Sequence, residues 1–331
     1  MDRRTFIKGV GAGLAVGAAG SACAREGSKL AIKKPSGSSR VAVMVDDKVR
    51  LESGFDAGRV KQLLDKTIQA ACGSQSGAGG LSSLFKKDDV VGVKLNCLAG
   101  PPLSPTKEFC NGLVELFNQA GIASEQIVFF ERAERDIRKG GFKVKRGSGQ
   151  PAYLGNDSSG AGYEEEVTIS GQVGSCLSKI LTKRITAMVN VGVLKDHNLA
   201  GVGVGMKNLF GLIHNPNKFH DNGCDPYVAD VLAFEVIQKK LKLVLVDGLT
   251  AQCNAGPGYF PGYAWPFNGL MASIDPVALD RVAWDILEKQ RAAQGLPSLT
   301  KEKRAPKWIH TAAKRGLGLD DLKKIKIIKE G

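Results

Sequence analysis

The sequence predicts an α/β fold with mainly parallel sheets and a ligand cleft at the carboxyl ends of the strands. Short apolar runs without polar alternation indicate buried parallel strands. Helical patterns with one apolar face separate these runs, as in folds whose helices cover both faces of a sheet. The chain of 331 residues is longer than one usual core, so we expect two α/β lobes, at residues 40–138 and 184–331.

The first lobe is predicted to run strand, helix, strand, helix, strand. These elements are expected, in chain order, at residues 40–46, 56–72, 89–96, 105–121 and 126–131. The second helix begins at a proline and ends at Gly121, which are common helix start and stop signals. The alternation predicts a βαβαβ unit with parallel strands.

The second lobe follows a segment, residues 139–183, that is rich in glycine, serine and lysine and is expected to be an irregular insertion. Its strands are expected at 184–194 and 241–248, and its helices at about 226–240 and 273–290. Asp275 before Pro276 is a predicted helix N-cap. The aromatic segment 256–267 is predicted to be a loop, either a lid that excludes water or a rigid cover.

Residues 1–24 are predicted to be a twin-arginine export signal, because Arg3 and Arg4 precede a short, weakly apolar run. This run is too short to cross a bilayer, which needs roughly 20 apolar residues. Two fates of the signal stay open, cleavage after a small-residue site or lipid attachment at Cys23. We therefore expect a periplasmic or exported protein, carried by the twin-arginine translocase, with a linker at 25–39 and membrane contact only through such an anchor.

The charge of the chain predicts a small anionic partner. Removal of the signal takes away one acidic and three basic residues and lowers the formal net charge from +13 to +11. Such a charge suits nucleic acid, anionic lipid or small acidic ligands. Export and the absence of an arginine-rich helix argue against nucleic acid. Six cysteines remain, an even number that permits disulfides, and their spacing matches no iron-sulfur cluster motif.

The stretch LKDHNLAGVGVGMKNLFG, residues 194–211, carries the strongest functional signal. It follows a predicted strand, where open α/β sheets place their ligand sites. Lys195 and His197 have strand spacing, so their side chains would share a face. The amides of three alternating glycines are predicted to bind an anion; these are Gly201, Gly203 and Gly205. The alternative is a tight glycine loop packed against its neighbours.

This stretch resembles the signature of the family called domain of unknown function 362 (DUF362), in which Lys-x-His precedes a glycine-bearing run ending in Lys-Asn-Leu-Phe-Gly. Further likenesses are VKLN at 93–96, Thr106, LVDG at 245–248, SIDPVALD at 273–280 and AAKRGLG at 312–318. The resemblance adds further candidates for the anion site, namely Lys94, Asn96, Thr106 and Asn208. Many relatives carry ferredoxin clusters, so a redox role here would need a partner protein.

A more distant resemblance is to the nickel-pincer lactate racemases. In that family a histidine is followed after nine residues by a lysine and later by a second histidine, an order shared by His197, Lys207 and His220. The resemblance implies that the lysine holds a modified-nicotinate cofactor, the first histidine is an acid and base, and the second ligates nickel. Where the racemases have another catalytic histidine, this chain offers Glu131 or Arg132.

The chemistry of these side chains is coherent with one site. Lys94 and Lys195 would clamp a carboxylate or phosphate, and His197, with an ordinary pKa of about 6.5, is the best general base. His220 is either a metal ligand or a structural histidine. Two functions stay open: a cofactor- or metal-dependent enzyme that acts on a small anion, with His197 in proton transfer, or a non-catalytic anion-binding protein or redox accessory subunit.

Overall fold

The computed structural model describes residues 37–330, which belong to one compact unit. The predicted export signal at 1–24, with Cys23, and nearly all of the linker at 25–39 lie outside the described residues. Within residues 37–330, no helix combines the length and the apolar character needed to cross a membrane.

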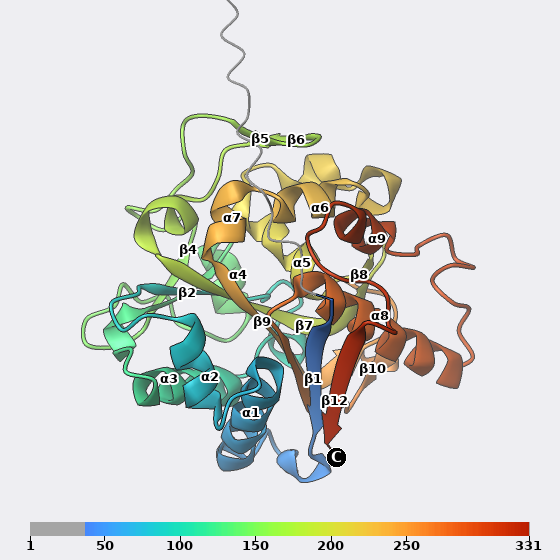
Figure 1. Cartoon of the computed structure of the whole chain (residues 1–331), viewed down its shortest axis with the longest axis horizontal. Helices are drawn as coiled ribbons and strands as arrows, with labels where there is room; N and C mark the ends of the chain where they lie inside the picture. Colours follow the sequence, from blue (N-terminus) through green and yellow to red (C-terminus); the bar gives the residue numbers. More distant parts are fainter. Residues whose placement is uncertain (1–36, 331) are drawn as a thin grey trace, which may run out of the picture. The chain divides into compact units, whose positions relative to one another are not determined.

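One large sheet organises the described chain (Figure 1). Its strands are β1 (Ser39–Val45), β2 (Val91–Lys94), β3 (Ile127–Glu131), β4 (Ala152–Gly155), β7 (Ala187–His197), β8 (Gly201–Val202), β9 (Leu241–Gln252), β10 (Ala264–Trp265), β11 (Gly269–Ser273) and β12 (Ile325–Glu330). The order is β12-β1-β11-β9-β7-β2-β3-β4, with β10 paired to β9 and β8 paired to β7. The central pairs β9-β7, β7-β2, β2-β3 and β3-β4 are parallel, which confirms the α/β class with a mainly parallel sheet.

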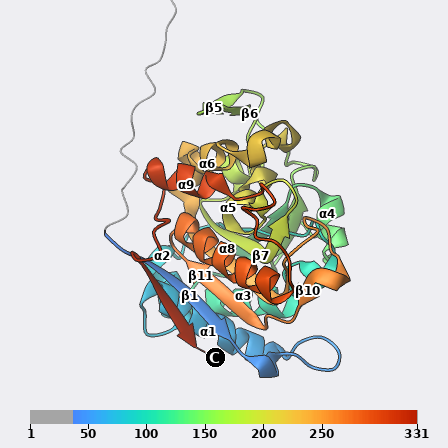
Figure 2. The same cartoon turned by 90° about the vertical axis from the view of Figure 1, so that its right-hand side faces the viewer.

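Helices cover both faces of the sheet (Figure 2). They are α1 (Ala57–Cys72), α2 (Gly77–Leu84), α3 (Lys107–Gln119), α4 (Glu134–Lys139), α5 (Gly205–Asn208), α6 (Tyr227–Leu232), α7 (Glu235–Lys240), α8 (Pro276–Ala293) and α9 (Lys307–Lys314). Side chains of β1 alternate between two cores: Val41 and Val43 pack with α8 and α9, whereas Ala42 and Met44 pack with α1 and α3. This period of two is what a sheet buried on both sides requires.

The helices predicted in the first half of the chain are confirmed. Helix α1 begins after Asp56, whose side chain accepts a hydrogen bond from the Arg59 amide, and it ends at Gly73 with φ at 66°. Helix α3 begins after Thr106, whose hydroxyl accepts the Phe109 amide. Such caps satisfy amides that a helix leaves without partners at its start.

The two predicted lobes share one sheet, which differs from the prediction of two separate lobes. Strand β2 of the first half pairs directly with β7 of the second half, from Val91↔Ala187 to Lys94↔Asn190. Strand β1 lies between β12 and β11 and is distant from β2 in the strand order. An apolar strand can pair with many different buried strands. The pattern therefore predicts where strands form but not which strands pair.

Two other segments differ in detail from the prediction. Residues 139–183 contribute the edge strand β4, a hairpin of β5 (Thr168–Ser170) and β6 (Val173–Ser175), and a π-helical turn at Ile180–Arg184. The helix predicted at 226–240 is two helices, α6 and α7, because the backbone of Phe234 has a non-helical ψ of 129° and its ring is buried.

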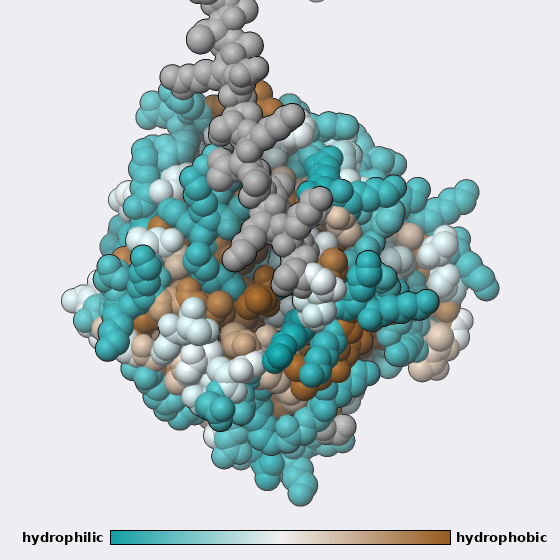
Figure 3. Space-filling view, in the orientation of Figure 1, coloured by the Kyte–Doolittle hydropathy of each residue, from teal (hydrophilic) through white to brown (hydrophobic). Residues whose placement is uncertain are grey.

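The face of the molecule in Figure 3 is mainly hydrophilic, with smaller hydrophobic areas. In residues 37–330 the exposed large hydrophobic side chains are Leu51, Leu98, Val167, Ile169, Leu199, Tyr259, Phe260 and Ile274. All six cysteines in the described part of the chain are free thiols, so the disulfides that their even number permits are not formed there.

Candidate functional site

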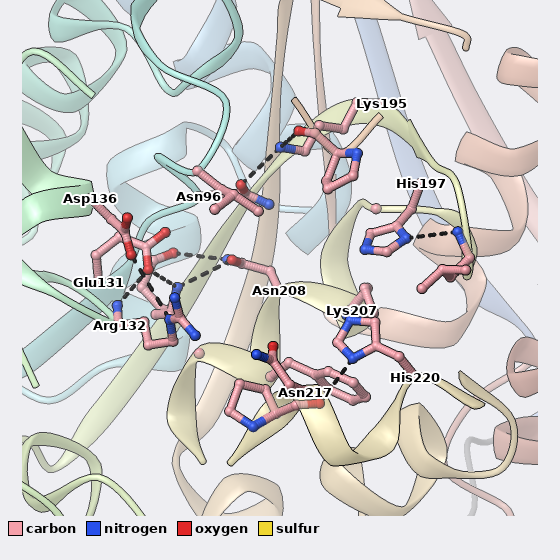
Figure 4. A pocket seen from close by; sticks show the side chains of 18 of the residues that line it. Asn96, Glu131, Arg132, Asp136, Lys195, His197, Lys207, Asn208, Asn217 and His220 are labelled. Atoms are coloured by element: carbon pink, nitrogen blue, oxygen red, sulfur yellow. Dashed lines mark hydrogen bonds and ion pairs between the residues drawn. The ribbon is translucent and has the colours of Figure 1, made fainter. Parts of the chain in front are cut away.

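A pocket of about 360 Å³ opens where three parallel strands end. Lys94 is the last residue of β2, Glu131 is the last residue of β3, and Lys195 and His197 end β7. The pocket thus lies where the ligand cleft was expected, at the carboxyl ends of the strands. The predicted site residues that line the pocket are Lys94, Asn96, Glu131, Lys195, His197, Gly203, Lys207, Asn208 and His220 (Figure 4).

The glycine run forms a tight hairpin and then a short helix. Gly201 pairs with His197 in the β7-β8 ladder, and the Gly203 amide donates to the Lys195 carbonyl at 2.9 Å. Gly201 has a φ of 79°, and a Cβ on it would lie 2.1 Å from the Arg304 carbonyl oxygen. The tight packed loop, which the sequence left as the alternative, therefore describes these two glycines.

An internal carboxylate occupies one of the three glycine amides that were expected to bind an external anion, the amide of Gly205. The amides of Gly205 and Met206 donate to the two carboxylate oxygens of Asp280, each at 2.8 Å. A Cβ on Gly205 would lie 2.7 Å from this carboxylate, so glycine permits the approach. Burial raises the pKa of Asp280 to about 7. Asp280 thus caps α5, and the predicted anion nest at Gly205 is filled by the protein itself.

Lys94 and Glu131 form a buried ion pair at 3.1 Å, with 1% and 6% of the side chains exposed. Glu131 also accepts the amides of Cys97 and Arg132. Each charge of this pair therefore has its partner in the protein, which favours a structural role for Glu131, and the catalytic role stays a prediction. Lys94 likewise is not free to clamp a substrate anion, as the sequence suggested.

Asn208 joins the strands beneath the pocket. Its side-chain amide donates to the side chain of Asn190 at 2.8 Å and to the Val191 carbonyl at 3.1 Å. Its oxygen accepts from Lys94 Nζ at 3.2 Å. Asn190 in turn donates to the Gly205 carbonyl at 2.8 Å. Asn208, predicted to bind an anion, is thus already engaged on both ends of its amide, and Asn190 is a buried partner that the sequence did not reveal.

Lys195 is a buried cation with neutral partners. Only 1% of the residue is exposed, and its Nζ donates to Asn96 Oδ1 at 3.1 Å and to the Pro257 carbonyl at 3.2 Å. Burial lowers its pKa to about 8. Across the described residues, its ammonium forms no ion pair with a carboxylate within 4.0 Å. Its charge is therefore available to an anion in the pocket.

Lys207 is the second buried cation of this kind. Its exposed fraction is 8%, its Nζ lies 3.1 Å from His220 Nε2, and it stands over the Phe210 ring at 3.8 Å from the centroid. Burial lowers its pKa to about 8. In the part of the chain that the structure describes, no carboxylate pairs with Lys207 either.

The tautomer of His220 follows from its partners. Nδ1 lies 3.0 Å from the Pro216 carbonyl oxygen, which can only accept, so Nδ1 carries a proton. In the neutral ring Nε2 then has a lone pair, and it accepts from the Lys207 ammonium. Burial and the charge of Lys207 lower the pKa of His220. His220 thus presents a basic nitrogen to Lys207.

His197 has the opposite tautomer. Its Nδ1 accepts the backbone amides of Leu199 and Ala200, each at 3.2 Å, so in the neutral ring Nε2 carries the proton. Burial and the neighbouring charge of Lys207 lower its pKa to about 2. With Nδ1 engaged by two amides, a ring that stays neutral keeps an Nε2–H that can donate a hydrogen bond in the pocket that His197 lines. This geometry differs from the general base that the sequence predicted for His197.

Thr106 does not join the other predicted anion-binding residues. Its amide and hydroxyl donate to Asp247 at 2.8 and 3.1 Å, and its oxygen also caps α3. Asp247 is fully engaged by these groups and by the Leu249 amide. Thr106 therefore holds the end of β9 to the start of α3, beside a different pocket.

The described residues could hold a cofactor at Lys207 but would supply few ligands to a metal. In residues 37–330, no group of three His, Cys, Asp or Glu side chains is arranged to bind a metal ion. His220 Nε2 is a single nitrogen with a lone pair next to an amine. A metal here would need its other ligands from an organic group bound in the pocket.

Several lining residues were not among the predicted site residues. They are Leu98, Asp136, Asn198, Leu199, Phe210, Gly211, Pro216, Asn217 and Pro257, whereas Arg132, which the racemase resemblance offered as an alternative to Glu131, does line the pocket. Phe210 stands three residues after Lys207, a spacing that brings side chains together on a helix and could have indicated the contact. Pro257 could not be found this way, because its carbonyl reaches Lys195 from a loop 62 residues away in sequence.

The fold and the pocket define an α/β protein with a pocket, lined by more basic than acidic residues, at the carboxyl ends of parallel strands. Four lining residues are basic, Lys94, Arg132, Lys195 and Lys207, against two acidic ones, Glu131 and Asp136. The sequence profile of the DUF362 family, described as a domain of unknown function, matches residues 91–285. This is more than half of the chain, and the chain belongs to the DUF362 family.

One solved structure is similar in arrangement at low sequence identity. It is a crystal structure of a Thermotoga maritima protein from the Northeast Structural Genomics Consortium, with 10% identity and a TM-score of 0.41. The match covers 72% of this chain and 59% of that chain, so it spans less than two thirds of the Thermotoga maritima protein. No curated protein matches the sequence.

Proposed function

We propose that the protein is an enzyme that binds a small organic anion in this pocket and transfers protons on it. The observation that carries the proposal is the pair of buried ammonium groups of Lys195 and Lys207, which have only uncharged partners among the described residues. A buried charge without an opposite charge costs several kcal/mol. A carboxylate or phosphate bound between the two lysines offsets that cost.

The proposed roles differ from those expected from the sequence. Lys195 anchors the anion. Its other partners are neutral carbonyl oxygens, which cannot take up its proton, so the ammonium keeps its positive charge. Lys207 and His220 form the proton-transfer pair, since an ammonium and a basic imidazole nitrogen lie 3.1 Å apart. His197 supports the proton transfer without exchanging its own proton, because its Nε2–H donates a hydrogen bond that stabilises negative charge on a substrate oxygen.

The alternative is a protein that binds the anion without turning it over. The shared position of Lys207 and His220 favours catalysis, because binding alone needs the ammonium but not a basic nitrogen beside it. Groups with lowered pKa values that gather in one cleft are also typical of catalytic sites.

Two further features are proposals that rest on the sequence. The paired arginines indicate export by the twin-arginine translocase to the periplasm. The resemblance also implies a cofactor held by Lys207, and the position of this lysine in the lining of the pocket supports it. Metal analysis and a visible spectrum of protein purified after export test the cofactor.

Binding calorimetry with lactate, pyruvate and phosphate tests the main proposal. Lys195→Met and Lys207→Met should each weaken the binding of these anions at least about tenfold, which corresponds to 1.4 kcal/mol. Lys289→Met is the matched control, because its side chain is 70% exposed outside the pocket. Equal affinity in both pocket variants and the control would defeat the proposal.

Proton exchange separates the enzyme from the binder. In D2O, the wild type should exchange the carbon-bound proton next to the carboxylate of a bound 2-hydroxy acid, or the methyl protons of pyruvate, as followed by proton NMR. His220→Gln should bind the anion and lose the exchange, because glutamine keeps a polar side chain but takes up no proton. Binding without exchange in the wild type would indicate the non-catalytic alternative.

A further inference from the structure

We infer that Lys207 is a nucleophile that condenses with the carbonyl group of a small 2-oxo acid to form an imine. This inference rests on the proposed function and makes it more specific. It assigns a covalent role to one of the two buried lysines and gives the chemical class of the substrate.

The partners of the two lysines distinguish their roles. Lys195 donates to two carbonyl oxygens, Asn96 Oδ1 and the Pro257 oxygen, and neither of these can take up a proton. Lys207 Nζ faces His220 Nε2 at 3.1 Å, and this imidazole nitrogen has a lone pair that can take the ammonium proton. Only Lys207 has a neighbour that can convert it to the free amine, which is the nucleophilic form.

The surroundings of Lys207 favour the neutral amine. The Phe210 ring covers Nζ at 3.8 Å, and the residue is 8% exposed. No carboxylate among the described residues holds the ammonium in its charged form. Burial lowers the pKa of Lys207 to about 8, so the free amine is accessible near neutral pH.

Two other side chains fit the remaining groups of a 2-oxo acid. The carboxylate of such an acid would bind to Lys195, which lacks a charged partner. Its carbonyl oxygen would accept from His197 Nε2–H, which the tautomer of the ring turns into a donor. The volume of about 360 Å³ lies at the low end of the range for small-molecule sites and suits an acid of this size.

The step balances with water as the product. His220 takes a proton from the Lys207 ammonium, and the amine attacks the carbonyl carbon while the C=O π bond breaks. The nitrogen of the adduct loses a proton and the oxygen gains one, which gives a neutral carbinolamine. Imidazolium of His220 returns its proton to the hydroxyl, water leaves, and the nitrogen lone pair forms the protonated imine. Overall, the ammonium and the ketone give the iminium ion and water.

Borohydride trapping tests the inference on the full chain. The protein is incubated with pyruvate, 2-oxobutyrate or 2-oxoglutarate, reduced with sodium borohydride, and analysed by intact mass and by peptide mapping. We expect one adduct per chain, located on Lys207. Lactate, which has no carbonyl carbon of this kind, is the control and should give none.

Two variants sharpen the result. Lys207→Arg keeps the positive charge without a nucleophilic amine, so it should lose the adduct while its circular dichroism and melting curve stay those of a folded protein. His220→Gln should slow trapping at pH 7 at least tenfold. The trapping rate of this variant should recover as the pH rises above 8, because Lys207 then loses its proton to the solvent without help from a neighbouring base. A trapping rate unchanged by His220→Gln at pH 7 would refute the assigned base.

The outcomes separate this inference from the proposed function. If calorimetry shows that the oxo acids bind in a Lys195-dependent way but no adduct forms on Lys207, the imine is wrong and the anion site stands. An adduct of equal yield in Lys207→Arg also overturns the inference. If none of the acids binds, both the imine and the anion site are wrong.

Discussion

The two sides of the pocket use buried lysines in opposite ways (Figure 4). On the side of Glu131, Lys94 is matched by a carboxylate at 3.1 Å, and that carboxylate accepts two further amides. On the side of His220, Lys207 has an imidazole and an aromatic ring as partners, and Lys195 has two carbonyl oxygens. Lysines of similar burial therefore differ in their partners: among the described residues, the charge of Lys94 is neutralised by a carboxylate, and the charges of Lys195 and Lys207 are not.

Under the proposed function, the difference marks where the protein gives up stability for binding. A buried ion pair with satisfied hydrogen bonds is strongly destabilised when one partner is removed, whereas a buried unpaired charge is a cost that its removal relieves. Strain of this kind is typical of functional sites, since activity and stability often oppose each other. The comparison can therefore be tested through the sign of the stability change at each lysine.

The largest effect is expected from breaking the matched pair. Lys94→Met should lower the free energy of unfolding by about 3–5 kcal/mol, because Glu131 would remain buried and charged without its cation. Urea unfolding measures this change. The double variant Lys94→Met with Glu131→Gln should recover most of the loss, since glutamine still accepts the amides of Cys97 and Arg132. A loss below about 1 kcal/mol in the single variant would show that the pair is not structural.

A smaller effect of opposite sign is expected at Lys207. Its pKa is lowered from 10.5 to about 8, so Lys207→Met should raise the free energy of unfolding by about 1–3 kcal/mol at pH 7. The same urea experiment measures it, and the exposed Lys289→Met should stay within about 0.5 kcal/mol of the wild type. Destabilisation at Lys207 comparable with that at Lys94 would remove the contrast between the two sides.

The smallest effect, per pH unit, is expected in how the stability difference between the wild type and Lys207→Met changes with pH. Between about pH 8 and 10.5 the unfolded chain still binds the Lys207 proton while the folded protein has released it. The stability of the wild type should therefore rise relative to Lys207→Met through this window, by at most about 1.4 kcal/mol per pH unit. Thermal melts of both proteins at pH 7, 8.5 and 10 measure the change, and parallel curves would contradict the lowered pKa.

The sequence located the site better than it predicted the role of each residue. Lys195, His197 and Lys207 lie in one conspicuous stretch at a strand end, and the rule for open α/β sheets is enough to place them in a cleft. Their roles depend on atoms far away in the chain. The tautomer of His220 is fixed by a carbonyl four residues before it, whereas the Gly205 amide donates to Asp280, 75 residues further along the chain.

Strand existence was similarly easier to predict than strand order. The apolar runs at β2, β3, β7 and β9 are evident in the sequence, and the caps Asp56, Thr106 and Asp275 mark three helix starts. Strand β2 pairs with β7, and β1 pairs with β11 and β12. These pairings join distant parts of the chain, and an apolar run does not specify its partner strand. Short glycine-rich α2 escaped prediction because its sequence has low helix propensity.

The position of β1 has a consequence for how the chain is made. This first strand is flanked by β11 and β12, which the ribosome produces more than 220 residues later, β12 as the last of the described strands. During translation β1 stays unpaired until β11 and β12 have been made. Its pairing then forms contacts of very long sequence separation, and such contacts form slowly. The native sheet is thus completed late, once β12 has left the ribosome and can pair with β1.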